Sequence, residues 1–235
     1  MMHKRIKDFQ DYAPHLDEAK EPLGGDVIIH AGDALARGTL NEFSDFIKWF
    51  SELDFIHRIY VPGNHDFICE QMEPFVKETC KTLGVTYLRD SGVIIDDGVK
   101  IWGSPQTPYF NNWAFNCARN EAERQMYNKP LIKNYWDMIP NDIDILVTHG
   151  PPYDILDELC YVNGDPKGEF VGCVDLLNAI KRIKPSIHLF GHIHCQGGKE
   201  LHRDGTSFYN VSICDEMYSP TLPVRIIEYN KELEK

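Results

Sequence analysis

The chain has 235 residues, of which 43% are hydrophobic and 26% are charged, and this size and composition suit one globular domain with a sizeable core. Its formal net charge is −12, which argues against tight binding to nucleic acid or to an anionic membrane, because like charges repel. No apolar run reaches membrane-spanning length, the first residues lack an export-signal core, and seven cysteines are scattered without a C-x-x-C pair, so we expect a cytoplasmic protein with reduced thiols.

The first part of the chain alternates strands and helices, which is typical of an α/β protein. Residues 26–30 predict a buried strand, and apolar residues then recur at helical spacing over 43–53 behind a capping box. Residues 58–61 predict the next strand. A second helix is expected over 72–83, where a glycine ends it.

The later part of the chain contains more strand signals. A hairpin is predicted over 93–103 with its turn at Asp97-Gly98, and residues 111–141 indicate mixed helix and loop. Beyond that segment we expect strands over 144–148 and 186–190, a helix over 174–183, and closing strands over 207–213 and 224–229.

Four of the predicted strands end in a short polar motif. These motifs are, in chain order, Asp33, Asn64-His65-Asp66, His149, and His192 with His194. The carboxyl ends of strands are where α/β proteins bind ligands. Aspartate, asparagine and neutral histidine are ligands for Mn, Fe, Co, Ni and Zn. The set therefore predicts a shared site for divalent metal ions, and this gives an acidic protein a positive centre for phosphate.

Each motif alone also has a purely structural explanation. His149 could be a hydrogen-bonded core histidine, Gly63-Asn64 an ordinary turn, and His192 with His194 a surface pair. The ordered set favours the metal site, in which two ions hold one hydroxide and a further histidine protonates the leaving oxygen. Asp66 either orients a nearby histidine or caps the following helix. His30 and His188 lie inside apolar strands, and we expect them to be packed there.

The motifs match a known family in order and spacing. Gly32-Asp33, Gly63 to Asp66, His149-Gly150 and Gly191 to His194 resemble the calcineurin-like metallophosphoesterases. Thr148 to Pro152, Lys184 to His194 and Asn210 to Glu216 are similar to the branch that includes the animal metallophosphoesterase-domain (MPPED-type) proteins. Because the resemblance runs from about Gly24 to Tyr229, residues 1–235 are expected to form a single domain of this family.

The resemblance implies a fold and an activity. The fold is a β-sandwich of two mixed sheets flanked by helices, with the site at one edge. Asp33 would bridge two divalent metal ions, such as Mn, Fe, Co, Ni or Zn. Asn64, His149 and His192 would complete one site, His194 would serve the other, and His65 would be the catalytic histidine. The implied enzyme is a hydrolase that cleaves phosphodiester or phosphomonoester bonds of a small substrate by metal-activated hydroxide.

The sequence departs from the family at one place. The family opens with a strand followed by D-x-H, and no D-x-H precedes Asp33 here. One metal then has four candidate ligands and the other has two. We therefore expect a strand ending in D-x-H to be missing before Met1, ahead of a helical pattern over residues 2–13. Two alternatives stay open: a weakly active or inactive regulator that binds a metal or a nucleotide, and a hydrolase of a non-phosphate bond.

Overall fold

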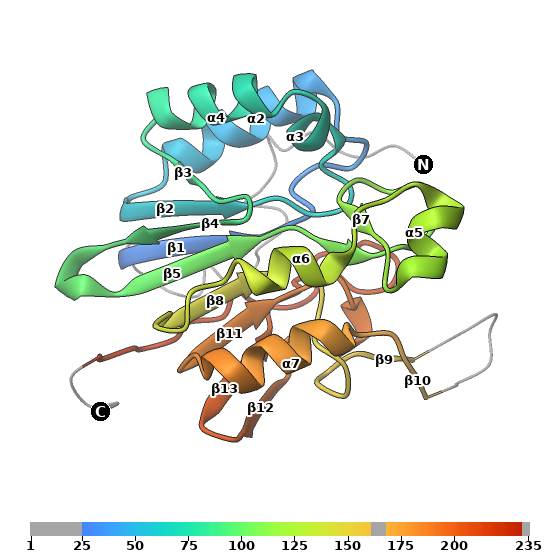
Figure 1. Cartoon of the computed structure of the whole chain (residues 1–235). Helices are drawn as coiled ribbons and strands as arrows, with labels where there is room; N and C mark the ends of the chain where they lie inside the picture. The colour runs from blue at the N-terminus through green and yellow to red at the C-terminus, as the bar shows by residue number, and fades with distance from the viewer. Residues whose placement is uncertain (1–24, 161–167, 232–235) are drawn as a thin grey trace.

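The computed structural model describes residues 25–160 and 168–231. Two sheets lie face to face, with helices on the outer side of each, as Figure 1 shows. The smaller sheet has the strand order β1-β2-β3, and the larger has the order β12-β13-β11-β8-β5-β4. The predicted α/β sandwich is confirmed, with one difference: the smaller sheet is wholly parallel, and only the larger one is mixed.

The smaller sheet and its helices come from the first part of the chain. Its elements are β1 (Gly25–Ala31), α2 (Leu40–Ser51), β2 (Phe55–Val61), α3 (Phe67–Gln71), α4 (Glu73–Thr82) and β3 (Thr86–Tyr87). The predicted capping box is present, because Thr39 accepts from the amide of Glu42 and the Glu42 carboxylate accepts from that of Thr39. The second predicted helix is α4, within one residue of its expected bounds. The short helix α3, which the sequence did not predict, precedes it, and the two are separated at Met72, where φ and ψ are non-helical.

The larger sheet and its helices come from the rest of the chain. Its strands are β4 (Ser91–Ile94), β5 (Lys100–Ser104), β8 (Ile145–Thr148), β11 (Ile187–Phe190), β12 (Glu200–Arg203) and β13 (Thr206–Asn210). The helices are α5 (Glu121–Tyr127), α6 (Ile132–Asp137) and α7 (Val174–Ile183). Short strands complete the fold as β6 (Thr107–Pro108), β7 (Asn116–Cys117), β9 (Glu158–Leu159) and β10 (Glu169–Phe170), with 3₁₀ turns η2 (Asp96–Gly98) and η3 (His194–Gln196).

Three apolar clusters hold the layers together. Between the sheets, Ile59 and Val61 of β2 pack with Ile101, Val147 and Leu189 of the larger sheet. The helices α2 and α4 cover the outer face of the smaller sheet, and α6 and α7 cover that of the larger one. Strands buried on both faces need apolar side chains on both faces. β8 (ILVT) and the last three residues of β2 supply them, and β11 (IHLF) is apolar apart from the buried His188.

Several sequence predictions need correction or fall outside the structure. Residues 224–229 form no strand, and β13 ends at Asn210 rather than at residue 213. The segment 224–229 has the composition of a strand, but Ile226 is 80% exposed, and a strand also needs a hydrogen-bonded neighbour. The helical pattern over residues 2–13, and the strand expected before Met1, lie outside the described residues. Among the residues that the structure describes, no helix combines the length and apolarity needed to cross a membrane.

The expectation of reduced thiols is wrong for one pair of cysteines. Cys160 and Cys195 form a disulfide with Cα atoms 6.1 Å apart, a separation within the normal range. The two residues are 35 positions apart, so no local spacing pattern pointed to them. The remaining cysteines are free thiols at Cys69, Cys80, Cys117, Cys173 and Cys214.

Candidate metal centre

The polar motifs meet at one end of the two sheets. Asp33 follows β1, Asn64 follows β2, His149 follows β8, and His192 follows β11. The pairs β1–β2 and β8–β11 are each parallel, so the carboxyl ends of their strands lie at the same edge. The contacts between these side chains join the edge of one sheet to that of the other.

His149 lies at the centre of the cluster and is 1% exposed. Its Nε2 is 2.8 Å from Oδ1 of Asn64, 3.2 Å from Oδ2 of Asp33, and 3.2 Å from Nδ1 of His192. Its Nδ1 lies 3.0 Å from the carbonyl oxygen of Ala31. When Nδ1 donates to that carbonyl, Nε2 of the neutral ring carries a lone pair. Four acceptor atoms then converge, and this donor set fits a divalent cation.

The charges of the cluster also favour a cation. Burial alone would raise the pKa of Asp33, but His149 together with His65 and His192 outweighs it, and that pKa lies well below its usual range. Burial lowers the pKa of His149, yet the Asp33 carboxylate raises it overall. Burial and the nearby His149 lower the pKa of His192 to about 3. The Asp33 carboxylate thus favours a positive charge at His149, and a bound divalent cation would meet the same carboxylate.

The backbone at the centre occupies costly conformations. Asp33 has φ 58° and His192 has φ 69°, both in the left-handed region that residues with a Cβ rarely adopt. Gly63 packs so closely that a Cβ there would lie 2.7 Å from Cε1 of His149 and would clash with Asp33. A Cβ on Gly32 would run into the ring of His149. Such strain persists where surrounding contacts enforce it, and it concentrates at functional sites.

Asp66 ties together the two loops that carry Asp33 and Asn64. Its buried carboxylate accepts from the amides of Gly63 at 2.7 Å and Leu35 at 2.9 Å, and more weakly from Ala34 at 3.4 Å. Burial and the charge of Asp33 raise the pKa of Asp66 to about 6. Neither expected role is seen: Asp66 makes no side-chain cap to α3, and these hydrogen bonds run to backbone amides rather than to a histidine ring.

His65 and His194 lie beside the cluster. The amide of His65 donates to Oδ1 of Asp33 at 2.8 Å, and its ring Nδ1 is 3.0 Å from the carbonyl oxygen of Ala36. This leaves Nε2 of His65 available for chemistry. Nδ1 of His194 is 2.9 Å from the carbonyl oxygen of Asp215, which likewise leaves Nε2 available. His194 borders the same groove as Asp33 but is not among the atoms that converge on His149.

Sequence reasoning missed two aromatic neighbours of these histidines. Trp113 packs against His65 with ring centroids 4.3 Å apart. Tyr218 contacts His194 at 5.2 Å and His65 at 6.2 Å. Both residues lie in loops, where no periodic pattern marks them. The only nearby signal was the motif Asn210 to Glu216, which ends two residues before Tyr218. As predicted, His30 and His188 are packed among core aromatic rings.

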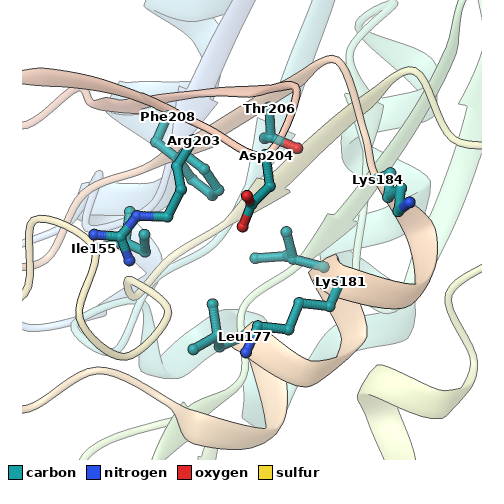
Figure 2. Close-up of a pocket in the computed structure, with 9 residues that line it drawn as sticks. Ile155, Leu177, Lys181, Lys184, Arg203, Asp204, Thr206 and Phe208 are labelled. Atoms are coloured by element: carbon teal, nitrogen blue, oxygen red, sulfur yellow. The ribbon is translucent and has the colours of Figure 1, made fainter.

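Two cavities differ in character. The metal centre opens into a groove of about 1460 Å³ between β1 and the inner face of the larger sheet. The other, shown in Figure 2, has a volume of about 470 Å³ and lies between α7 and the β12–β13 hairpin. It has Lys181, Lys184, Arg203 and Asp204 at its rim and shares no lining residue with the groove.

The comparison with known families matches this geometry. The calcineurin-like phosphoesterase family matches residues 2–196. The chain belongs to this family. Its members use divalent metals, usually two, which agrees with the donor atoms around His149.

Curated relatives and solved structures agree with this assignment. Metallophosphoesterase domain-containing protein 1 of Homo sapiens and of Mus musculus is 35% identical over 227 residues, covering 87% of this chain and 64% of the relative. The chain thus spans less than two thirds of the length of these relatives. A crystal structure of phosphopantetheinyl hydrolase from Mycobacterium tuberculosis has a TM-score of 0.53 at 17% identity, covering 87% of this chain and 86% of that one. This likeness shows a shared fold.

Proposed function

We propose that the chain is a metal-dependent phosphoesterase that hydrolyses phosphodiester bonds, and secondarily phosphomonoesters, of small molecules. The observation that carries the proposal is the convergence of Asp33, Asn64 and His192 on a buried His149 whose other nitrogen already faces a carbonyl oxygen. Bound divalent ions supply the positive charge that polarises a phosphoryl group and activates water. The family match supports the reaction class, the resemblance to the MPPED-type branch favours a phosphodiester, and the donor atoms favour the metals.

The chain's own residues take separate parts in this proposal. Asp33, Asn64, His149 and His192 would hold one ion, and His194, with Asp33, would serve a second. Mn, Fe, Co, Ni or Zn suits this mixed oxygen and nitrogen set. His65 is the catalytic histidine: its Nδ1–H donates to the carbonyl of Ala36, and in the imidazolium form its Nε2 proton would pass to the leaving oxygen and leave the ring neutral. The products are an alcohol and a phosphate with one ester bond fewer.

One observation favours a second function. Among the described residues, Asp33 and His194 are the ligands we assign to a second ion, fewer than the three protein ligands usual in an open catalytic site. A regulator that binds one metal, with little or no turnover, is consistent with that shortage. Such a protein would bind Mn²⁺ at the His149 centre but would not hydrolyse phosphate esters.

A panel of three chromogenic esters separates these functions. We would assay bis(p-nitrophenyl) phosphate, p-nitrophenyl phosphate and p-nitrophenyl acetate with Mn²⁺ and with EDTA, using His192→Ala as the control variant. The proposal predicts Mn²⁺-dependent release from the phosphodiester, lost in EDTA and in His192→Ala. Metal binding without turnover of either phosphate ester would favour the regulator, and metal-independent cleavage of the acetate alone would contradict both.

A further inference from the structure

Two aromatic rings border the candidate site beside its free histidine nitrogens. Tyr218 is 61% exposed and meets the ring of His194 edge to face at an interplanar angle of 84°. It also lies near His65, the catalytic histidine of the proposed function. Trp113 packs against His65 and is backed by Phe67, with ring centroids 5.9 Å apart. A group leaving or remaining on the phosphate beside His65 therefore meets aromatic surface.

The backbone holds Tyr218 in place through the same carbonyl that orients His194. The carbonyl oxygen of Asp215 accepts from Nδ1 of His194 and from the amide of Tyr218, both at 2.9 Å. The Asp215 carboxylate accepts from the amides of Met217 and Ser219, each at 2.9 Å. Tyr218 has φ 59°, a conformation that tyrosine adopts only where its surroundings enforce it. The exposed ring is therefore preorganised next to His194.

The two rings have different parts to play. Trp113 is half-buried between His65 and Phe67, so its contacts position the catalytic histidine. Tyr218 is exposed, and the rings it contacts meet it at steep angles, so much of its surface stays open to a ligand. Aromatic groups bind such a surface by offset stacking or edge-to-face contact, which an alkyl group cannot reproduce. An exposed tyrosine at the site thus discriminates by the shape of the ester group.

We propose that Tyr218 is a specificity-determining residue that selects phosphate esters carrying a flat aromatic group. This inference rests on the proposed function, because it concerns the ester group of the same phosphate substrate. It adds a contact made by neither the metal ligands nor His65. The phosphate would lie at the metal centre with its leaving group toward His65, and the aromatic group that stays on phosphorus would lie against Tyr218 beside His194.

The kinetic test uses two diesters that share one leaving group. Bis(p-nitrophenyl) phosphate and methyl p-nitrophenyl phosphate both release p-nitrophenolate and differ only in the group that stays on phosphorus. We expect Tyr218→Ala to lower kcat/KM for the first about 5- to 10-fold and to change the second less than about 2-fold. Tyr218→Phe, which keeps the ring, should retain the aryl preference. An equal loss on both diesters would mean that Tyr218 only supports His194, and no loss on either would also overturn the proposal.

An equilibrium measurement keeps this inference separate from the proposed activity. Binding of phenyl phosphate and of methyl phosphate to the Mn²⁺-loaded protein would be measured by calorimetry. We expect phenyl phosphate to bind about 5- to 10-fold more tightly to the wild type and the two to bind about equally to Tyr218→Ala. Equal wild-type affinities, or no binding of either, would overturn the role of Tyr218. An aryl preference without any hydrolysis would overturn only the proposed activity.

Discussion

Replacing Asp66 with alanine should loosen the metal centre without touching a metal ligand. The change removes the acceptor of two short hydrogen bonds, from the amides of Gly63 and Leu35. Each buried amide left unpaired costs about 1–3 kcal/mol, so the variant should lose roughly 2–6 kcal/mol of stability. The loops carrying Asp33 and Asn64 would also separate. We expect Mn²⁺ affinity to fall about 10- to 100-fold, the usual effect of losing a group that orients metal ligands.

The loss of stability in Asp66→Ala should depend on pH with a definite sign. The folded state raises the pKa of Asp66 to about 6 from a usual 3.8, so the folded protein binds the proton more tightly. The stability that this proton contributes is complete below about pH 4 and is lost as the pH rises through 6. In metal-free buffer, the wild type should therefore exceed Asp66→Ala in free energy of unfolding by about 1 kcal/mol more at pH 5 than at pH 7.

Urea unfolding at both pH values and Mn²⁺ titration at pH 7 would measure these effects. Asp45→Ala is a matched control, because Asp45 is an exposed aspartate on α2 and such changes usually stay within about 0.5 kcal/mol. Asp66→Asn keeps one acceptor oxygen, so its stability and its Mn²⁺ affinity should lie between those of the control and those of the alanine variant. If Asp66→Ala matched the control in both stability and Mn²⁺ affinity, the role assigned to this carboxylate would be refuted.

Three further predictions concern other residues of the centre and the core. His65→Ala should keep its metal but lose turnover about 10²- to 10⁴-fold, most severely for poor leaving groups in a series of aryl phosphates; loss of metal would make His65 a ligand instead. Gly63→Ala should lose Mn²⁺ affinity, because its Cβ would push His149 and Asp33 apart; unchanged calorimetric binding would refute this close approach. Buried His188 has a pKa lowered to about 3, so its contribution to stability is present above pH 6.5 and lost as the pH falls. When the pH is lowered from 7 to 5, the free energy of unfolding of the wild type should thus fall by about 2 kcal/mol more than that of His188→Gln. Equal losses in urea unfolding would contradict this role of His188.

Much of the fold was predictable because local signals and packing agree. β8 and the end of β2 are short buried apolar runs, β11 is apolar apart from His188, and α7 combines helical periodicity with a following Pro185. The hairpin of β4 and β5 followed from the Asp97-Gly98 turn, where Asp97 adopts φ 58°. Each of these elements is specified by residues close together in the sequence, and each reappears in the structure within a few residues of its predicted bounds.

What could not be predicted depends on tertiary contacts. Residues 224–229 have strand-like composition but form no ladder in the described part of the chain. Cys160 and Cys195 meet only after folding. Within the site, the sequence placed the ligand types at strand ends, because a motif directly after a strand has a fixed position. The partners of Asp66 and the approach of Tyr218 to His194 depend on how separate loops fold back, and no periodicity encodes that.

The most direct test of the central claim is the metal content of the purified protein. Wild type, His149→Ala, His192→Ala and the control His202→Ala would be loaded with Mn²⁺, freed of loosely bound ions and analysed by inductively coupled plasma mass spectrometry. His202 is exposed on β12 and is not among the proposed ligands. We predict that wild type and His202→Ala retain Mn²⁺ and that both other variants lose it. Unchanged metal content in His149→Ala and His192→Ala would contradict the assignment of this centre.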